Sequence, residues 1–404
     1  MRKTCLLLLV LLHLSCDSEV QIGNAKSAID LTAIEETPQL LSIRELMRNV
    51  EYLRLNSSDE YYLADASKIK PLKNKYIIYD KIKMSLTAWS KQGDFLSHVG
   101  NKGFGPGEYK SVTDFDIHPK RNSIFVFSRG DKSILEYDSG LKFKKRFRVE
   151  PWALYMSVLS NGNIALYSYF DNPEMNIVIY DPESGNVLDE RMAYPNSLKP
   201  ELVDYSGFIR GDYYTYPFSN KVYKVGDLGD PIDSIYFEIK IPDQRDPELK
   251  FDHAGYLSHT NKENNEILRD FTVGYNGTEI LFYYGYRTRG RTGMTIGVMN
   301  RSGQVYGHVN LKHGGRDKSE PFNRLFFLNP YNVPRYSTAD HFYYLPINQS
   351  GMTNVFGEGR EEFLKGIKEV DVNLFNELQQ MEQGDNPIIM KFRLRSQYAQ
   401  MIER

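Results

Sequence analysis

The chain has 404 residues and a formal net charge of -2, with 41% hydrophobic and 25% charged residues. This balance is ordinary for a protein that buries a core, so it excludes wholesale disorder. No run of basic residues could neutralise phosphates, which excludes a nucleic-acid-binding protein. The 29 Tyr and 22 Phe favour half-buried β-strands, and the length suits one large all-β domain or two smaller ones.

The N-terminus has the pattern of an export signal. A positive start at Arg2 and Lys3 precedes an apolar core at residues 5–12, which is too short to span a bilayer, and the segment closes at Cys16. It resembles a bacterial lipoprotein signal. The resemblance implies that residues 1–15 are removed and that Cys16 becomes the acylated first residue. The alternative is an ordinary secretory signal with a chance cysteine.

Cysteine usage agrees with such a signal. Cys5 and Cys16 are the two cysteines of the chain, so the mature domain has no disulfide and depends on its core. Asp17 and Glu19 weakly resemble the acidic export tags of Bacteroidetes surface lipoproteins, although short acidic stretches are common by chance. We therefore expect a lipid-anchored protein of the cell envelope, at the outer membrane, on its periplasmic or its surface side.

The first strands follow a polar segment. Residues 16–48 have weak helical character and are predicted to be an N-terminal tether. Residues 50–55 then alternate as a first strand, and strand pairs at 69–80 and 86–99 complete a first blade.

Residues 100–140 contain the clearest repeat unit. A glycine cluster opens it, Phe115 and Ile117 alternate with aspartates, and Gly- or Pro-containing turns separate the strands that follow. Four short antiparallel strands of this kind make one blade of a β-propeller. Turn glycines set the period, since Gly93, Gly140 and Gly185 lie 47 and then 45 residues apart, close to the roughly 40 to 50 residues of a propeller blade.

The rest of the chain continues the repeat with two interruptions. Residues 242–266 are charged and lack alternation, which predicts a loop insertion. At 358–383 apolar residues recur every three or four positions, which predicts an amphipathic helix, or two short ones broken near Asp371. This insertion either packs on the propeller or forms a lid over one end of its channel. Residues 386–394 are a closing strand, expected to pair in the blade that contains the first strand.

The period gives six blades for a propeller domain at residues 49–396, with seven as the alternative. The predicted fold class is all-β, a six-bladed β-propeller with a short amphipathic helical insertion near the C-terminus.

Two motifs carry a family resemblance. Gly103-Phe104-Gly105-Pro106-Gly107-Glu108-Tyr109 lies between the first two blades, and Asp385-Asn386-Pro387 precedes the closing strand. With them the chain resembles the six-bladed β-propeller lipoproteins of Bacteroidetes, which are related to NHL-repeat propellers. The resemblance implies no established activity. We expect Gly103, Gly105, Pro106, Gly107 and Glu108 to be structural, because no helix follows them to complete a phosphate cradle.

A search for catalytic motifs is negative. The sequence has no HExxH, no GxSxG, no Walker loop and no EF-hand spacing, and we predict no cofactor. Asp114 and Asp116 share a strand face, either as a carboxylate pair in the channel or, as we favour, on a solvated face. The mature histidines show no metal-ligand spacing and are interpreted as surface residues: His98, His118, His253, His259, His308, His313 and His341.

Two further patterns have structural interpretations. Four Tyr-Tyr doublets are expected to place one ring between blades and turn the other away, so core filling is favoured over a sugar-stacking platform. The doublets begin at Tyr61, Tyr213, Tyr283 and Tyr343. The Arg-Gly-Asp triplets that begin at Arg129 and Arg210 are interpreted as glycine-containing turns.

The leading functional hypothesis is a binding scaffold. A propeller brings loops from every blade to one face, where they could recognise a glycan, a peptide or an envelope protein. The alternative is a metal-dependent hydrolase or lyase with its site at the channel mouth. A purely structural subunit of an envelope complex is a third possibility.

Overall fold

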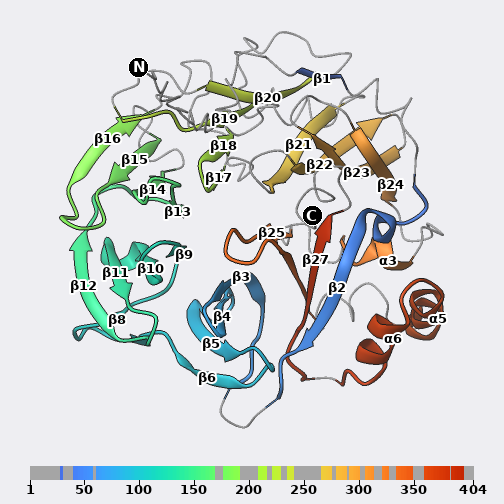
Figure 1. Cartoon of the computed structure of the whole chain (residues 1–404), viewed down its shortest axis with the longest axis horizontal. Helices are drawn as coiled ribbons and strands as arrows, with labels where there is room; N and C mark the ends of the chain where they lie inside the picture. Colours follow the sequence, from blue (N-terminus) through green and yellow to red (C-terminus); the bar gives the residue numbers. More distant parts are fainter. Residues whose placement is uncertain are drawn as a thin grey trace, which may run out of the picture.

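A computed structural model shows six small sheets arranged in a ring around a common centre (Figure 1). Six sheets confirm the predicted six-bladed β-propeller, so the seven-bladed alternative is wrong. The structure describes residues 28–30, 40–57, 61–168, 176–191, 208–215, 221–228, 234–240, 265–274, 279–288, 291–300, 305–313, 321–326, 334–348, 359–382 and 384–394.

Blades one to three are four-stranded antiparallel meanders, with the first strand nearest the centre and the fourth at the rim (Figure 1). Blade one contains β3 (Ala66–Leu72), β4 (Lys75–Asp80), β5 (Ser85–Ser90) and β6 (Phe95–His98). Blade two contains β9 (Asp114–His118), β10 (Ser123–Ser128), β11 (Ser133–Tyr137) and β12 (Phe143–Arg148). Blade three contains β13 (Tyr155–Val158), β14 (Ile164–Tyr167), β15 (Ile177–Tyr180) and β16 (Val187–Arg191).

Blades four and five repeat this order, and β1 (Ala28–Asp30) adds a parallel fifth strand to blade four beside β20. Blade four contains β17 (Phe208–Arg210), β18 (Tyr213–Thr215), β19 (Lys221–Lys224) and β20 (Ser234–Lys240). Blade five contains β21 (Asn265–Val273), β22 (Glu279–Thr288), β23 (Arg291–Asn300) and β24 (Val305–His313).

Blade six joins the two ends of the propeller. Its strand order is β25 (Arg335–Tyr336), β26 (Tyr343–Ile347), β27 (Ile388–Leu394) and β2 (Met47–Arg54). The closing strand does pair with the first strand, with Tyr52 opposite Met390. The placement of residues 50–55 in the first blade was wrong, because β2 is instead the rim strand of blade six. This pairing closes the ring and gives β27 a partner on both sides.

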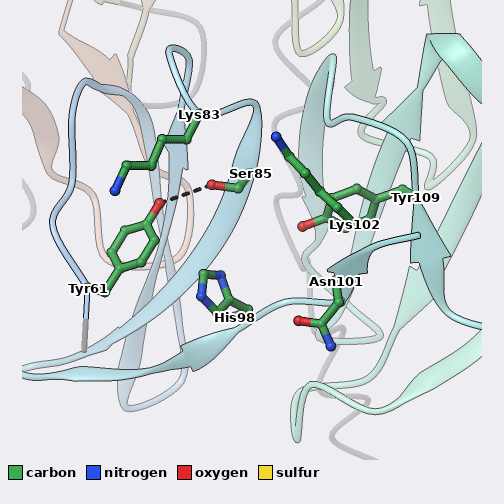
Figure 2. A pocket seen from close by; sticks show the side chains of 8 residues that line it. Tyr61, Lys83, Ser85, His98, Asn101, Lys102 and Tyr109 are labelled. Carbon is green, nitrogen blue, oxygen red and sulfur yellow. Dashed lines mark hydrogen bonds between the residues drawn. The ribbon is translucent and has the colours of Figure 1, made fainter.

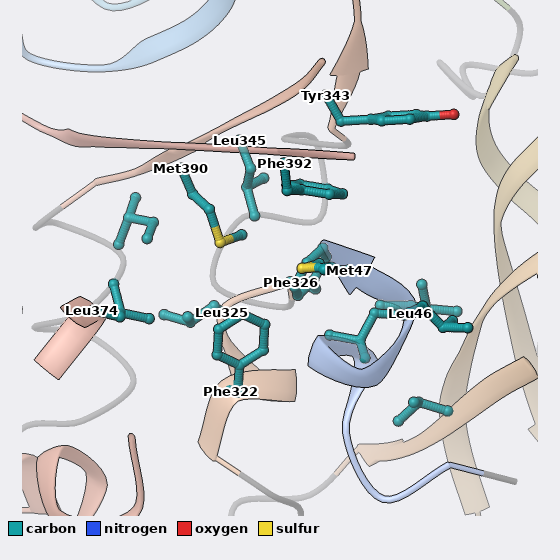
Figure 3. Close-up of a cluster of buried hydrophobic side chains, with 14 of the residues drawn as sticks. Leu46, Met47, Phe322, Leu325, Phe326, Tyr343, Leu345, Leu374, Met390 and Phe392 are labelled. Atoms are coloured by element: carbon teal, nitrogen blue, oxygen red, sulfur yellow. The ribbon is translucent and has the colours of Figure 1, made fainter. Parts of the chain in front are cut away.

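The hydrophobic core is divided into clusters between neighbouring blades. Tyr343 lies in the cluster shared with blade five (Figure 3), whereas Tyr344 lies in the cluster shared with blade one. Both rings are 1% exposed, so the expectation that one Tyr of each doublet turns away is wrong here. The reason is that a blade packs against a neighbour on both of its faces. Core filling is therefore the role of this doublet.

The helical insertion forms two helices, α5 (Arg360–Val370) and α6 (Val372–Gln379), separated at Asp371. They lie outside β2, on the side away from the centre of the ring, so they form no lid (Figure 1). Their buried residues pack with η1 (Ile43–Leu46) and α3 (Pro321–Arg324) against blade six. Asp371 caps α6 by accepting the Leu374 N–H at 3.0 Å.

Several predicted segments lie outside the described residues. These are the signal at 1–15, Cys16, most of the tether at 16–48, and the loop insertion at 242–266 except for the first residues of β21. No helix of the described residues is long and apolar enough to cross a membrane.

Candidate functional site

The glycine cluster lies in the connector, which we define as residues 100–110, between blades one and two. Two short parallel strands, β7 (Asn101–Lys102) and β8 (Glu108–Tyr109), enclose its tight loop. Glu108 Oε2 accepts the Gly105 N–H at 2.8 Å, and a Cβ at Gly103 would lie 2.0 Å from that oxygen. Gly107 has a φ of +74°, and its Cβ would meet Phe143 Cβ at 2.7 Å. The glycines thus make room for the chain's own side chains.

Two buried tyrosines fasten the connector to the propeller. Tyr109 Oη donates to the Val99 carbonyl at 3.1 Å, and Tyr137 Oη donates to the Gly107 carbonyl at 2.9 Å. Burial raises the pKa of Tyr109 to about 12, so its hydroxyl stays protonated and keeps donating near neutral pH. The connector is therefore a fixed wall.

A pocket of about 300 Å³ separates this wall from blade one (Figure 2). Its lining residues come from the segment before β3, the β4–β5 turn, the end of β6 and the connector: Tyr61, Lys83, Ser85, His98, Gly100, Asn101, Lys102 and Tyr109. These segments are far apart in the sequence, and the propeller brings them together.

The blade-one wall of the pocket is packed internally. Phe95 stacks on the Tyr61 ring at 5.2 Å between centroids, and the Lys83 ammonium lies 4.2 Å from the centroid of the same ring. Tyr61 Oη is within 3.0 Å of Ser85 Oγ. The chain's own side chains therefore surround this ring, which disfavours the sugar-stacking platform at Tyr61.

Charge in the pocket is positive. Lys83, which also hydrogen-bonds the Tyr62 carbonyl, stands on one side and the exposed Lys102 stands on the other (Figure 2). Burial and the Lys83 charge lower the pKa of His98, so this imidazole is neutral at pH 7. The pocket can hold oxygen-rich or anionic groups through ammonium, hydroxyl and amide donors.

Comparison with known proteins adds the family. The profile described as "Domain of unknown function (DUF4934)" matches residues 26–393. The chain belongs to the DUF4934 family. A search of curated proteins gave no match for this DUF4934 chain.

Solved structures share the fold of this DUF4934 member. A Bacteroides fragilis protein described as exported has 16% identity and a TM-score of 0.64, with 88% of this chain and 97% of that chain covered. A member of the DUF4221 family from Bacteroides vulgatus has 10% identity and a TM-score of 0.55, with 87% and 98% covered. These findings confirm the resemblance to Bacteroides propeller proteins, while the relation to NHL repeats stays a prediction.

The two aspartates of β9 are not on a solvated face, and that interpretation was wrong. Asp114 is 7% exposed and Asp116 is 3% exposed. Asp114 accepts hydrogen bonds from Lys68 Nζ in blade one at 2.8 Å and from the Met156 N–H in blade three at 2.9 Å. Burial lowers the pKa of Lys68, although the charges of both aspartates oppose that shift. Strand alternation could not reveal the neighbouring innermost strands that bury this face.

Asp116 repeats the arrangement one rung further along β9. It lies 2.5 Å from Lys70 Nζ and accepts the Val158 N–H at 3.0 Å. Burial alone would raise the pKa of Asp116, but the charges of Lys70 and Lys68 and these hydrogen bonds outweigh it and lower the pKa. Each carboxylate thus links the innermost strands of blades one, two and three, and each is paired with a lysine.

The histidines of the described residues do not form a cluster. His98 borders the pocket, while His118 and His308 are buried, so the surface interpretation was wrong for those two. His341 Nδ1 lies 2.8 Å from Tyr336 Oη. His253 and His259 lie outside the described residues, as does the side chain of His313. Within the described part of the chain, no three His, Cys, Asp or Glu side chains form a metal-binding group.

The first Arg-Gly-Asp triplet forms the short 3-10 helix η2 (Arg129–Asp131) between β10 and β11. In the second, Arg210 ends β17 and the next two residues form the predicted turn. Both carboxylates are engaged. Asp131 Oδ2 accepts the Lys110 N–H at 2.7 Å and the Ser128 hydroxyl at 2.6 Å. Asp212 Oδ1 accepts the Ser160 N–H at 2.7 Å.

Sequence reasoning missed Lys83, Ser85 and Lys102 as pocket residues. None belongs to a motif, and a single sequence does not show that the β4–β5 turn faces the connector. The available signal was indirect: the glycine cluster predicts a tight connector between blades one and two.

Proposed function

We propose that this chain is an exported, lipid-anchored propeller that binds a ligand at the cell envelope. The observation that carries the proposal is the pocket between blade one and the connector. Its walls are fixed by buried hydrogen bonds of Tyr109 and Tyr137, and Lys83 and Lys102 supply positive charge. A preformed concave site with a few polar groups is the usual form of a ligand site.

The chemistry of the lining favours a ligand with carboxylate, sulfate or clustered hydroxyl oxygens. A glycan with acidic sugars, an acidic peptide segment or an envelope protein that presents one would meet this requirement. The lipoprotein-type N-terminus ending at Cys16 supports attachment to the outer membrane, and the similar Bacteroides fragilis protein described as exported supports passage out of the cytoplasm.

The test fills the pocket without changing its charge. Asn101→Tyr adds bulk on the exposed strand β7, and Asn74→Tyr makes the same change in the exposed β3–β4 turn. Glycan arrays and pull-downs from cell envelopes should detect a ligand that the wild type and Asn74→Tyr retain and Asn101→Tyr loses by at least tenfold, or about 1.4 kcal/mol. Retention by Asn101→Tyr would contradict the pocket. If the arrays and pull-downs detect no ligand while the protein turns over a lactone or a glycoside, the binding proposal is wrong and the function is catalytic.

A further inference from the structure

Exposed apolar side chains concentrate at one end of blades one to three. In an antiparallel meander the β4–β5 and β10–β11 turns lie at the same end as the connections between blades. Five large apolar side chains project there, with exposed fractions of 45% for Tyr62, 66% for Ile82, 45% for Met84, 83% for Phe104 and 44% for Trp152. These side chains lie at the tips of separate loops, and none of them fills a groove.

The surface extends over the three blades on both sides of the pocket. Lys83 Nζ lies 5.3 Å from the Tyr62 ring centroid, and Lys110 Nζ lies 5.7 Å from that of Phe104. Lys110 also donates to the Gly130 carbonyl at 3.2 Å in the next turn. The neighbouring Arg129 guanidinium lies 4.7 Å from the Trp152 ring centroid. We call this surface the connector face, formed by Tyr62, Lys81, Ile82, Lys83, Met84, Lys102, Phe104, Lys110, Arg129, Lys132 and Trp152.

Positive charge dominates the connector face although the whole chain carries a formal charge of -2. Six of the residues that define it are lysines or arginine. Among the described residues at this end, three carboxylates have partners of their own. Asp131 accepts the Lys110 N–H and lies 3.7 Å from Lys110 Nζ, Glu150 lies 3.0 Å from Arg148 Nε, and Asp65 accepts from Asn348 Nδ2 at 2.7 Å. The six cations of the connector face outnumber these three carboxylates.

The opposite end of the same blades differs. Its described turns, at residues 73–74, 91–94, 119–122, 138–142 and 159–163, contain no exposed large apolar side chain. Lysines such as Lys120 and Lys142 are exposed there as well. In the described turns of these blades, exposed large apolar tips are therefore a feature of the connector face.

We infer that the connector face docks on an anionic phospholipid surface. Aromatic and aliphatic tips inserted at the headgroup level, with lysine and arginine contacting phosphates, is the pattern of a peripheral membrane-binding surface. A rigid protein partner would need a pocket for each protruding side chain, whereas lipid headgroups can move apart to accommodate these side chains. The inference goes beyond the proposed function and does not depend on the pocket ligand.

Binding to vesicles of phosphatidylethanolamine and phosphatidylglycerol, compared with phosphatidylcholine vesicles, tests the inference. The full chain with Cys16→Ser cannot be acylated, and every variant shares its N-terminus, so that segment contributes equally. Lys81→Ala and Lys102→Ala should each weaken binding to the anionic vesicles by roughly 5-fold. Lys120→Ala and Lys142→Ala at the opposite end should leave it unchanged.

The apolar tips have a matched control at the rim. Ile82→Ser with Phe104→Ser should weaken vesicle binding, whereas Val187→Ser with Leu188→Ser, exposed at 48% and 43% on β16, should not. Equal effects of the two pairs would overturn the inference.

Tryptophan fluorescence gives an independent measurement. The chain has two Trp, of which Trp89 is 0% and Trp152 is 44% exposed. Anionic vesicles should shift the Trp152 emission to shorter wavelength, lipids brominated near the headgroup should quench it, and Trp152→Phe should abolish both effects. A chain that sediments with vesicles while its Trp152 emission stays unchanged binds through another part, and the inference is then wrong.

Discussion

The side-chain oxygen of Asn386 accepts a hydrogen bond of 2.6 Å from the backbone N–H of Leu63. The amide nitrogen of the same side chain donates to the Asn56 carbonyl at 3.0 Å. Asn386 is 1% exposed and directly precedes the segment leading into β27. One buried amide therefore holds both sides of the connection between β2 and β3 against the closing strand.

Asn386→Ala should lower the free energy of unfolding by about 2 to 4 kcal/mol, because it leaves one buried donor and one acceptor without partners. Urea denaturation followed by tryptophan fluorescence measures the change. Asn74→Ala, in an exposed turn, is the control and should stay within about 0.5 kcal/mol of the wild type. Equal stability of the two variants would show that Asn386 does not fasten the ring.

Gly107→Ala should destabilise the protein by more than about 1 kcal/mol. A left-handed backbone disfavours any L side chain by roughly 1 to 2 kcal/mol, and the added methyl would also press on Phe143 Cβ. Gly130→Ala is the comparison, since its Cβ would meet its nearest atom at 3.6 Å without a positive φ. If thermal unfolding shows both alanines to be neutral, the connector is looser than its contacts indicate.

Asp116→Asn should cost about 2 to 4 kcal/mol at pH 7, because it leaves Lys70 and its buried surroundings without a countercharge. The pKa of Asp116 is lowered in the folded protein, so its contribution is present above the unfolded value near ~4 and is lost as pH falls through the lower folded value. The stability difference between wild type and variant should therefore shrink below about pH 4. A difference that stays constant down to pH 2 would contradict the ion pair as its source.

Cys16→Ser should release the protein from the membrane fraction after a high-salt wash. The wash screens any contact of lysines with lipid phosphates and leaves an acyl anchor intact. Fractionation of cells that express each form makes the comparison, with Cys5→Ser as the matched control that should remain anchored. An unchanged membrane fraction for Cys16→Ser would contradict acylation at that residue.

The repeat could be predicted from the sequence because its turns are local features with steric requirements. The β5–β6 turn requires glycine at position 93, because a Cβ there would lie 2.0 Å from the Arg54 carbonyl on the rim strand of the preceding blade. The same requirement appears at Gly185, where a Cβ would lie 2.6 Å from Phe147 Cβ. Gly140 has no such contact with another blade, since its Cβ would meet Asp138 Oδ1 of its own turn at 3.2 Å. The regular spacing of the three glycines was nevertheless enough to count the blades.

Properties that depend on two blades at once could not be read in this way. Alternation along β9 placed Asp114 and Asp116 on one face, but the lysines that meet them belong to β3 of another blade. Likewise, the pocket combines a turn lysine with a connector lysine, and no pattern links Lys83 to Lys102. Side-chain chemistry at a junction needs the ring geometry, which a single sequence supplies only as a fold class.

The pairing of β2 with β27 also sets the order of events in folding. β2 is among the first described strands to leave the ribosome and β27 is the last, so β2 lacks its ladder partner until the rest of the propeller has been made. The ring therefore stays open until β27 has been made. Pairing of strands so far apart in the sequence is also slow. Closure of the ring is therefore expected to be the last step of folding, after all the described strands have been made.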